Sequence, residues 1–153
     1  MMTRTFLPGL IAALAVSTAI AADAPLPVVT QDAFLASLKA DAQALFVLDV
    51  RTPEEYAAGY VPGAVNIPHD QLASRLAEVP KDREVVVYCR SGRRSEIAGQ
   101  VLADHGYMKL EHLQGDMQGW QTAQRPVDVP RDPAACTAAL KAGELKPESC
   151  LPR

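Results

Sequence analysis

The sequence of 153 residues lacks several features that whole classes of proteins require. Its formal net charge is −3, so it has no general positive charge with which to bind nucleic acid or an anionic membrane surface. It contains no GxGxxG fingerprint and no phosphate-binding lysine motif, which excludes the common nucleotide-binding loops. Its three histidines show no ligand spacing with one another or with a cysteine pair, so we expect no metal site and no cofactor; they are His69, His105 and His112.

Cysteine is scarce, and the count is odd. The three cysteines are Cys89, Cys136 and Cys150, so at least one thiol stays unpaired in a monomer of an exported protein. Pairing Cys136 with Cys150 would close a loop of about 15 residues and contribute about 3 kcal/mol by loop entropy. This is the disulfide that we expect, and it leaves Cys89 free. The sequence alone also leaves open a pairing of Cys89 with either of the others.

The N-terminus has the pattern of an export signal. Arg4 is followed by an apolar run over residues 6–16, and small residues precede a cleavage position before Ala22. We therefore expect residues 1–21 to be a signal peptide, and the mature protein to work in a bacterial periplasm without membrane attachment. A membrane anchor is the alternative, but residues 6–22 are near the lower length limit for a span and are interrupted by proline and glycine.

Strand patterns and helix patterns alternate along the rest of the chain. Continuous apolar runs predict strands within residues 44–50 and 84–89. Shorter strands are expected within residues 24–29, 61–68 and 109–114. Helical patterns are expected within residues 30–40, 52–59, 69–80 and 93–106. The alternation predicts one α/β domain over residues 22–125, with about five strands in a mostly parallel sheet and helices on both faces.

Local signals set the helix boundaries. Thr30 is expected to cap one helix, and the residues Thr52, Pro53 and Glu55 form a capping box with proline at the first helical position. The helix within 93–106 is expected to bury one face, made of Ile97, Ala98, Val101, Leu102 and His105.

Residues 126–153 differ from the rest of the chain. They are rich in proline and show no strand pattern, so we expect a C-terminal tail appended to the domain. The expected disulfide between Cys136 and Cys150 would clasp this tail.

The strongest chemical signal lies at Cys89. This cysteine directly follows the most apolar strand and precedes a helix, and parallel sheets bind ligands beyond the carboxyl ends of their strands. The intervening loop can turn successive N–H groups inward as an anion-binding nest, to which the helix N-terminus adds its dipole. These features favour thiolate over thiol and would hold a small anionic substrate. A buried structural cysteine is the alternative, but it leaves the loop composition unexplained, namely Arg90, Gly92, Arg93 and Arg94.

Spacing distinguishes two chemistries at such a loop. Phosphate-handling cysteine loops commonly have an arginine six positions after the cysteine, where this chain has Ser95. The loop is one residue short for a tetrahedral phosphate, which favours a smaller sulfur cargo on Cys89. A phosphatase or an arsenate reductase is therefore the weaker alternative.

Three segments together resemble a known family. "YCRSGRRS" at 88–95, "LDVRTPEEYAAGYVPGAVNIP" at 48–68 and "LQGDMQGW" at 113–120 look like the motifs of rhodanese-like sulfurtransferases of the single-domain, exported type. The resemblance covers about residues 26–125. Tyr60 is a departure, since the family often has histidine there.

The resemblance implies a mechanism. Cys89 would take a sulfur atom from an anionic donor such as thiosulfate, form a persulfide, and pass the sulfur to a thiol or to cyanide. The substrate would bind to the loop residues Arg90, Ser91, Gly92, Arg93, Arg94 and Ser95. Of these, Ser95 would cap the helix or donate a hydrogen bond to the sulfur. Asp49 and Arg51 would brace the loop, with a purely local ion pair as the alternative. A monomer is expected, and a non-catalytic sulfur carrier or anion-binding module is the other reading.

Overall fold

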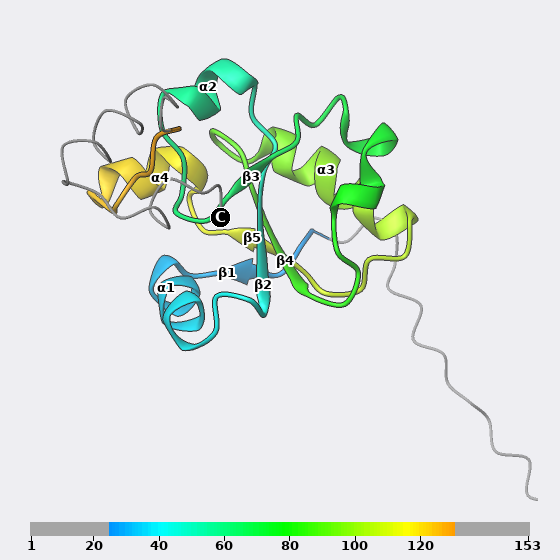
Figure 1. Cartoon of the computed structure of the whole chain (residues 1–153), viewed down its shortest axis with the longest axis horizontal. Coiled ribbons are helices and arrows are strands. Elements are labelled where there is room, and N and C mark those ends of the chain that lie inside the picture. The colour runs from blue at the N-terminus through cyan, green and yellow to red at the C-terminus, as the bar shows by residue number, and fades with distance from the viewer. Residues whose placement is uncertain (1–24, 131–153) are drawn as a thin grey trace, which may run out of the picture.

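The computed structural model describes residues 25–130, and its core is a five-stranded parallel sheet (Figure 1). The strand order is β1-β5-β4-β2-β3, and every pairing is parallel. The elements are β1 (Val28–Val29), α1 (Gln31–Ala40), β2 (Leu45–Asp49), α2 (Pro53–Ala57), β3 (Val65–Asn66), β4 (Glu84–Tyr88), α3 (Arg93–Asp104), β5 (Leu110–Leu113) and α4 (Asp116–Thr122). The predicted α/β domain with about five strands is confirmed.

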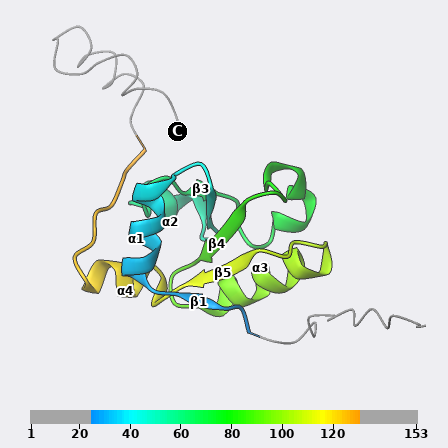
Figure 2. The same cartoon turned by 90° about the horizontal axis from the view of Figure 1, so that it is seen from below.

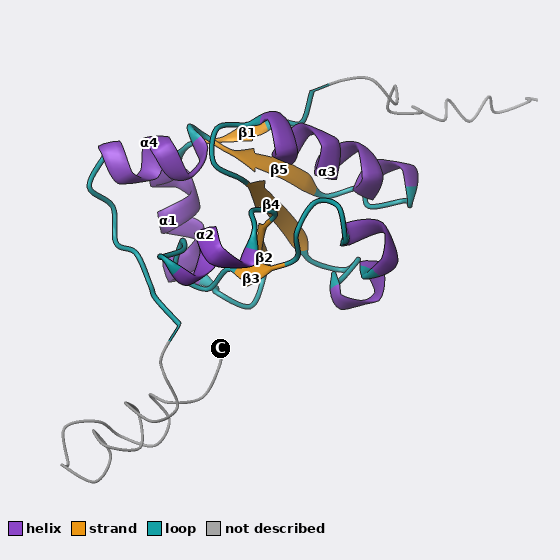
Figure 3. Ribbon diagram, turned by 90° about the horizontal axis from the view of Figure 1, so that it is seen from above, coloured by secondary structure: helices purple, strands orange, loops and turns teal. Residues whose placement is uncertain are grey.

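Helices cover both faces of the sheet, as Figure 3 shows. One buried cluster lies between the sheet and α3, around Leu48, Val87 and Leu102. The other lies on the opposite face, where Phe34 of α1 meets Trp120 of α4 edge to face, with ring centroids 5.8 Å apart. The view from below in Figure 2 shows α1 and α4 on the side of the sheet opposite α3. Apolar burial on both faces explains the uninterrupted apolar runs of β2 and β4.

The predicted helix starts are confirmed. Thr30 accepts a hydrogen bond from the Ala33 amide at 3.2 Å, and Thr52 and Glu55 form the reciprocal capping box with Pro53 in the first turn. Within residues 25–130, no helix is long and apolar enough to cross a membrane.

Two helix predictions were wrong in detail. Residues 69–80 form two short 3₁₀ turns, Leu72–Ser74 and Leu76–Glu78, instead of an α-helix. In α3 the buried face is displaced from the predicted one: Ile97 is 44% exposed and His105 is exposed. The face that packs on the sheet is built from small residues and one leucine, Ser95, Ala98, Gly99 and Leu102, because the helix approaches the sheet and Leu26 closely.

The sheet register brings the two chemically interesting strand ends together. Asp49, at the end of β2, lies opposite Tyr88, at the end of β4, so Cys89 and the segment after β2 share one edge. The chain beyond α4 returns to the same edge: Tyr60 and Asp128 exchange backbone hydrogen bonds of 2.8 and 2.9 Å. The predicted signal peptide, residues 1–21, and the predicted disulfide partners, Cys136 and Cys150, lie outside the described residues.

Candidate active site

Cys89 sits immediately after β4, with its side chain turned into the loop that leads to α3. It is 1% exposed and is a free thiol, the one cysteine among residues 25–130. The amide of Gly92 donates a hydrogen bond to the Cys89 sulfur at 3.1 Å. Gly92 has φ 108° and ψ −42°, a conformation that a side chain opposes, and it caps the start of α3. The predicted turn of loop amides toward the sulfur is therefore present at this residue.

The loop rests on the start of α4. The carbonyls of Cys89 and Arg90 accept hydrogen bonds of 3.1 Å from the amides of Met117 and Gln118. These are first-turn amides of α4, which have no partner inside the helix. The sulfur-bearing loop and the segment 113–120 are thus one structural unit.

The carboxylate of Asp116 lies beneath the loop and is hydrogen-bonded to Cys89, Ser95 and His112. Its Oδ1 accepts the Cys89 amide at 2.7 Å and the Ser95 hydroxyl at 2.9 Å, and its Oδ2 lies 2.9 Å from His112 Nε2. Burial raises the pKa of Asp116, but the hydrogen bonds from His112, Cys89 and Ser95 outweigh burial and leave the pKa below its usual value. Asp116 is therefore a buried carboxylate beside the thiol.

A second buried carboxylate, Asp49, organises the neighbouring strand end. Arg51 binds it with three hydrogen bonds of 2.5 to 3.0 Å and also donates to the carbonyl of Gly59 at 2.8 Å. The Tyr88 hydroxyl donates to Asp49 at 2.6 Å and accepts the Val61 amide at 3.1 Å. Among the described residues, no fully buried side-chain nitrogen or oxygen lacks a partner. Asp49 and Arg51 thus form a local ion pair, and they reach the Cys89 strand through Tyr88.

The three loop arginines have different surroundings. Arg94 binds both oxygens of Glu55, at 2.6 and 2.9 Å. The hydrogen bonds from Arg94 lower the pKa of Glu55 to about 2, against a smaller opposing effect of burial. Arg93 is exposed and makes no side-chain hydrogen bond within residues 25–130. Glu55 therefore has a second role beyond the capping box that its sequence position predicted.

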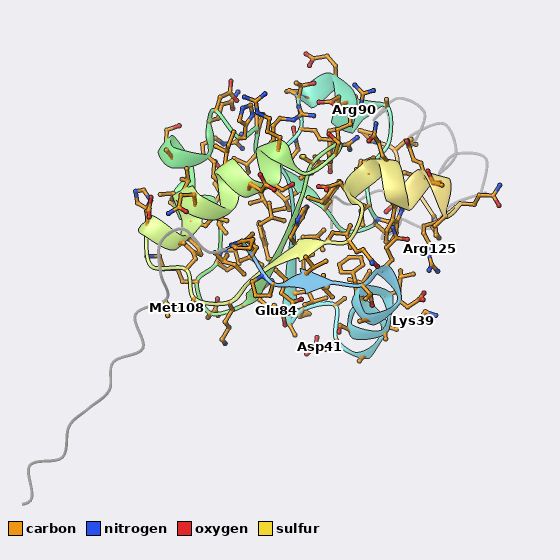
Figure 4. All side chains as sticks on the ribbon, turned by 180° about the vertical axis from the view of Figure 1, so that it is seen from behind. Lys39, Asp41, Glu84, Arg90, Met108 and Arg125 are labelled. Atoms are coloured by element: carbon orange, nitrogen blue, oxygen red, sulfur yellow. The ribbon has the colours of Figure 1, made fainter. Side chains whose placement is uncertain are left out.

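Arg90 lines a cleft of about 330 Å³ beside the loop. The cleft lies between the end of α2 and the start of α4, and its wall includes Arg51, Glu55, Gly59, Met117 and Gln118. Figure 4 shows Arg90 at the end of the molecule that carries α2 and α4, opposite Glu84 and Met108. This cleft gives a small anion or thiol a place next to the cysteine loop.

The two loop serines are placed differently. Ser91 is exposed. Ser95 is fully buried in the first turn of α3, and its hydroxyl donates to Asp116. Ser95 thus binds the carboxylate beneath the loop, a role different from the expected helix cap or sulfur contact.

Sequence reasoning did not identify His112, Asp116 or Glu55 as site residues. Asp116 belongs to the segment 113–120, which resembles a family motif, and it directly follows Gly115. That position was the signal available in the sequence. His112 lacks metal-ligand spacing, and only the fold places it against the carboxylate.

Comparison with known proteins agrees with this geometry. Residues 30–123 match the rhodanese-like domain family. A sulfurtransferase of Allochromatium vinosum is 40% identical over 91 residues, which cover 60% of this chain and 85% of that protein. The thiosulfate sulfurtransferase PspE of Escherichia coli is 40% identical over 70 residues, 44% of this chain and 67% of that protein. A crystal structure of a full-length Lactobacillus plantarum protein superposes with TM-score 0.61 at 28% identity, covering 67% of this chain and 87% of that one.

A parallel sheet that presents a cysteine loop at its carboxyl edge, with this match over the whole domain, defines a sulfur-transfer class of protein. The chain belongs to the rhodanese-like domain family and is a rhodanese-like sulfurtransferase. The predicted rhodanese-like family and α/β fold are confirmed, and the exported type stays a prediction.

Proposed function

We propose that this protein is a thiosulfate sulfurtransferase that works through a persulfide on Cys89. In the first step the Cys89 thiolate attacks the outer sulfur of thiosulfate. The sulfur–sulfur bond of the donor breaks, its electron pair leaves with sulfite, and a new sulfur–sulfur bond forms on Cys89. In the second step a thiolate or cyanide attacks the terminal sulfur, and the Cys89 thiolate is released.

The observation that carries this proposal is the Gly92 amide aimed at the Cys89 sulfur at 3.1 Å, at the N-terminus of the twelve-residue helix α3. A backbone N–H and a helix N-terminus stabilise an anionic sulfur without a proton transfer. The Arg94 guanidinium adds its charge: its pKa is raised first by the hydrogen bonds with Glu55 and further by the charge of Cys89. The cleft beside Arg90 provides the approach for an anionic donor.

Thiocyanate formation from thiosulfate and cyanide tests the proposal. The wild-type protein is expected to turn over, and Cys89→Ser is expected to lose all activity above the uncatalysed rate. Cys136→Ser is the matched control and should retain turnover. Equal rates for the wild type and Cys89→Ser would refute the enzyme assignment.

We also propose that the protein works in a bacterial periplasm. This location is supported by the basic start, the apolar run and the small residues that precede Ala22. Cell fractionation with N-terminal sequencing of the product checks it. A product that starts at Ala22 in the periplasmic fraction is expected, whereas an uncleaved cytoplasmic product would contradict it.

A further inference from the structure

Beneath the cysteine loop lies a titratable side chain that the sulfur-transfer steps do not use. His112 ends close to Asp116, with 2.9 Å between Nε2 and Oδ2, and its side chain is 19% exposed. The other oxygen of Asp116 accepts the amide of Cys89 itself at 2.7 Å. One carboxylate therefore joins the imidazole to the backbone of the reactive residue.

The loop glycine lies between the sulfur and this pair. The Gly92 amide donates to the Cys89 sulfur, while a Cβ placed on Gly92 would lie 3.5 Å from Asp116 Oδ2 and 3.7 Å from His112 Cε1. The imidazole, the carboxylate and the sulfur thus surround a single residue of the loop. At such short range, with little solvent between, their charges interact strongly.

The backbone of Asp116 adopts a conformation that most side chains disfavour. Asp116 has φ 53°, in the left-handed region that costs a non-glycine residue about 1 kcal/mol. Gly115 precedes it with φ 74°, so two successive residues adopt this conformation. Alanine at this position would incur the same backbone cost and would lose the bonds to Cys89, Ser95 and His112.

The carboxylate creates an electrostatic problem for a thiolate. A buried negative charge whose oxygen lies 2.7 Å from the Cys89 amide opposes a second negative charge on the adjacent sulfur. A protonated imidazole on the other side of the carboxylate neutralises that charge. The charged groups that face His112 are Asp116 on α4 and Glu96 on α3, and both are acidic. The hydrogen bond with Asp116 is the largest effect on the His112 pKa, and it raises that pKa in spite of burial.

We propose that protonated His112, paired with Asp116, is a positioning residue for sulfur transfer, which holds the cysteine loop and offsets the carboxylate charge that would otherwise oppose the Cys89 thiolate. The role of His112 in sulfur transfer rests on the proposed function. The coupling between His112 and the ionisation of Cys89 does not, because it can be measured without any sulfur donor.

The pH dependence of Cys89 alkylation tests this coupling without a donor. The protein is treated with iodoacetamide over a range of pH, and modification of Cys89 is followed by peptide mass spectrometry, which separates it from Cys136 and Cys150. In His112→Gln, the midpoint of the profile is expected to move upward by roughly one pH unit, because the compensating charge is gone. His105→Gln is the matched control: His105 is exposed, its Nδ1 lies 2.7 Å from the Val101 carbonyl at the end of α3, and its removal should leave the profile unchanged.

A second variant keeps the test decisive if His112→Gln folds poorly. Asp116→Asn can still accept the Cys89 amide but carries no charge, so its midpoint should move downward. In the Asp116→Asn background, adding His112→Gln should then produce little further shift. A His112→Gln profile that coincides with the wild type, or an equal shift in both backgrounds, would overturn the inference.

The outcomes separate this inference from the proposed function. Normal thiocyanate formation with an unshifted His112→Gln alkylation profile removes the coupling and leaves the enzyme. Absent thiocyanate formation with a shifted profile removes the proposed activity and leaves the coupling. With thiosulfate as donor, His112→Gln should also lower kcat/KM at neutral pH by roughly fivefold.

Discussion

Arg94 and Glu55 form a two-bond ion pair, at 2.6 and 2.9 Å, between the first turn of α3 and the first turn of α2. The pair ties the segment after β2 to the helix that follows the cysteine loop. It also fixes the guanidinium beside the sulfur, so the loop arginines cannot be equivalent.

Replacing Arg94 and Arg93 by alanine should therefore give different results. Arg94→Ala removes a fixed charge near Cys89 and leaves Glu55 without its partner, so kcat/KM for thiosulfate should fall by roughly tenfold or more. Arg93→Ala removes an exposed charge without a side-chain partner in residues 25–130, and its effect should stay within about twofold. Steady-state thiocyanate assays measure both. Equal losses of kcat/KM in the two variants would contradict a specific role for Arg94 and would mean that the arginines contribute only their net charge.

Gly92 and Gly63 offer a matched pair for the loop backbone. Both have positive φ, 108° and 81°, so alanine is strained at either position, by roughly 1–3 kcal/mol. Gly63 lies in an exposed turn with open space around it, whereas the Gly92 amide contacts the sulfur. Gly92→Ala should lose most of the sulfur-transfer activity, and Gly63→Ala should keep it at a similar cost in stability. Denaturant unfolding and the thiocyanate assay together check this, and a fully active Gly92→Ala would exclude a role for the loop geometry.

Tyr88→Phe should destabilise the fold more than Tyr107→Phe. The Tyr88 hydroxyl serves the buried carboxylate of Asp49 and the Val61 amide, and both would lose a partner. Leaving a charged group underbonded costs about 2 to 3 kcal/mol. The single proton of the Tyr107 hydroxyl is shared between two uncharged acceptors, the carbonyls of Leu76 and Val79, so a loss of about 1 kcal/mol is expected. Urea unfolding at pH 7 measures both variants, and the reverse order would contradict the importance of the Asp49 network.

Glu111 lies on β5, away from the cysteine loop, and should make the free energy of unfolding depend on pH. Burial and then the neighbouring carboxylate of Glu84 raise the pKa of Glu111 to about 7, from an ordinary 4.5. Because the folded protein binds this proton more tightly than the unfolded chain, protonation of Glu111 stabilises the fold. This contribution to the free energy of unfolding is complete below about pH 4.5 and is lost as the pH rises through about 7. Glu111→Gln should raise the free energy of unfolding at pH 8 by on the order of 1 kcal/mol, and by much less at pH 4.5. Thermal unfolding at the two pH values checks this, and an equal effect at both would refute the shift.

Sequence signals that act over a few residues predicted the structure well. The capping box of Thr52 and Glu55, the apolar run of β4 and the position of Cys89 after it depend on neighbours in the chain, and the structure agrees with each. The 3₁₀ turns at 72–78 were missed because two leucines at helical spacing do not distinguish an α-helix from short turns that bury the same side chains.

The contacts that sequence reasoning missed join distant segments. Asp116 is 27 residues from Cys89, and Arg94 is 39 residues from Glu55. No local spacing encodes such pairs, because the strand order brings them together only after the sheet has formed. For the same reason, Ser95 looked like a helix cap, although its hydroxyl donates to a carboxylate 21 residues away.

The most direct test of the central claim is the mass of the Cys89 peptide after the protein has reacted with thiosulfate in the absence of reductant. The wild type is expected to gain one sulfur atom on Cys89 and to lose it when cyanide is added, while Cys89→Ser gains none. A Cys89 peptide that stays unmodified while thiocyanate still accumulates, or a sulfur atom found instead on Cys136 or Cys150, would contradict a persulfide at this loop.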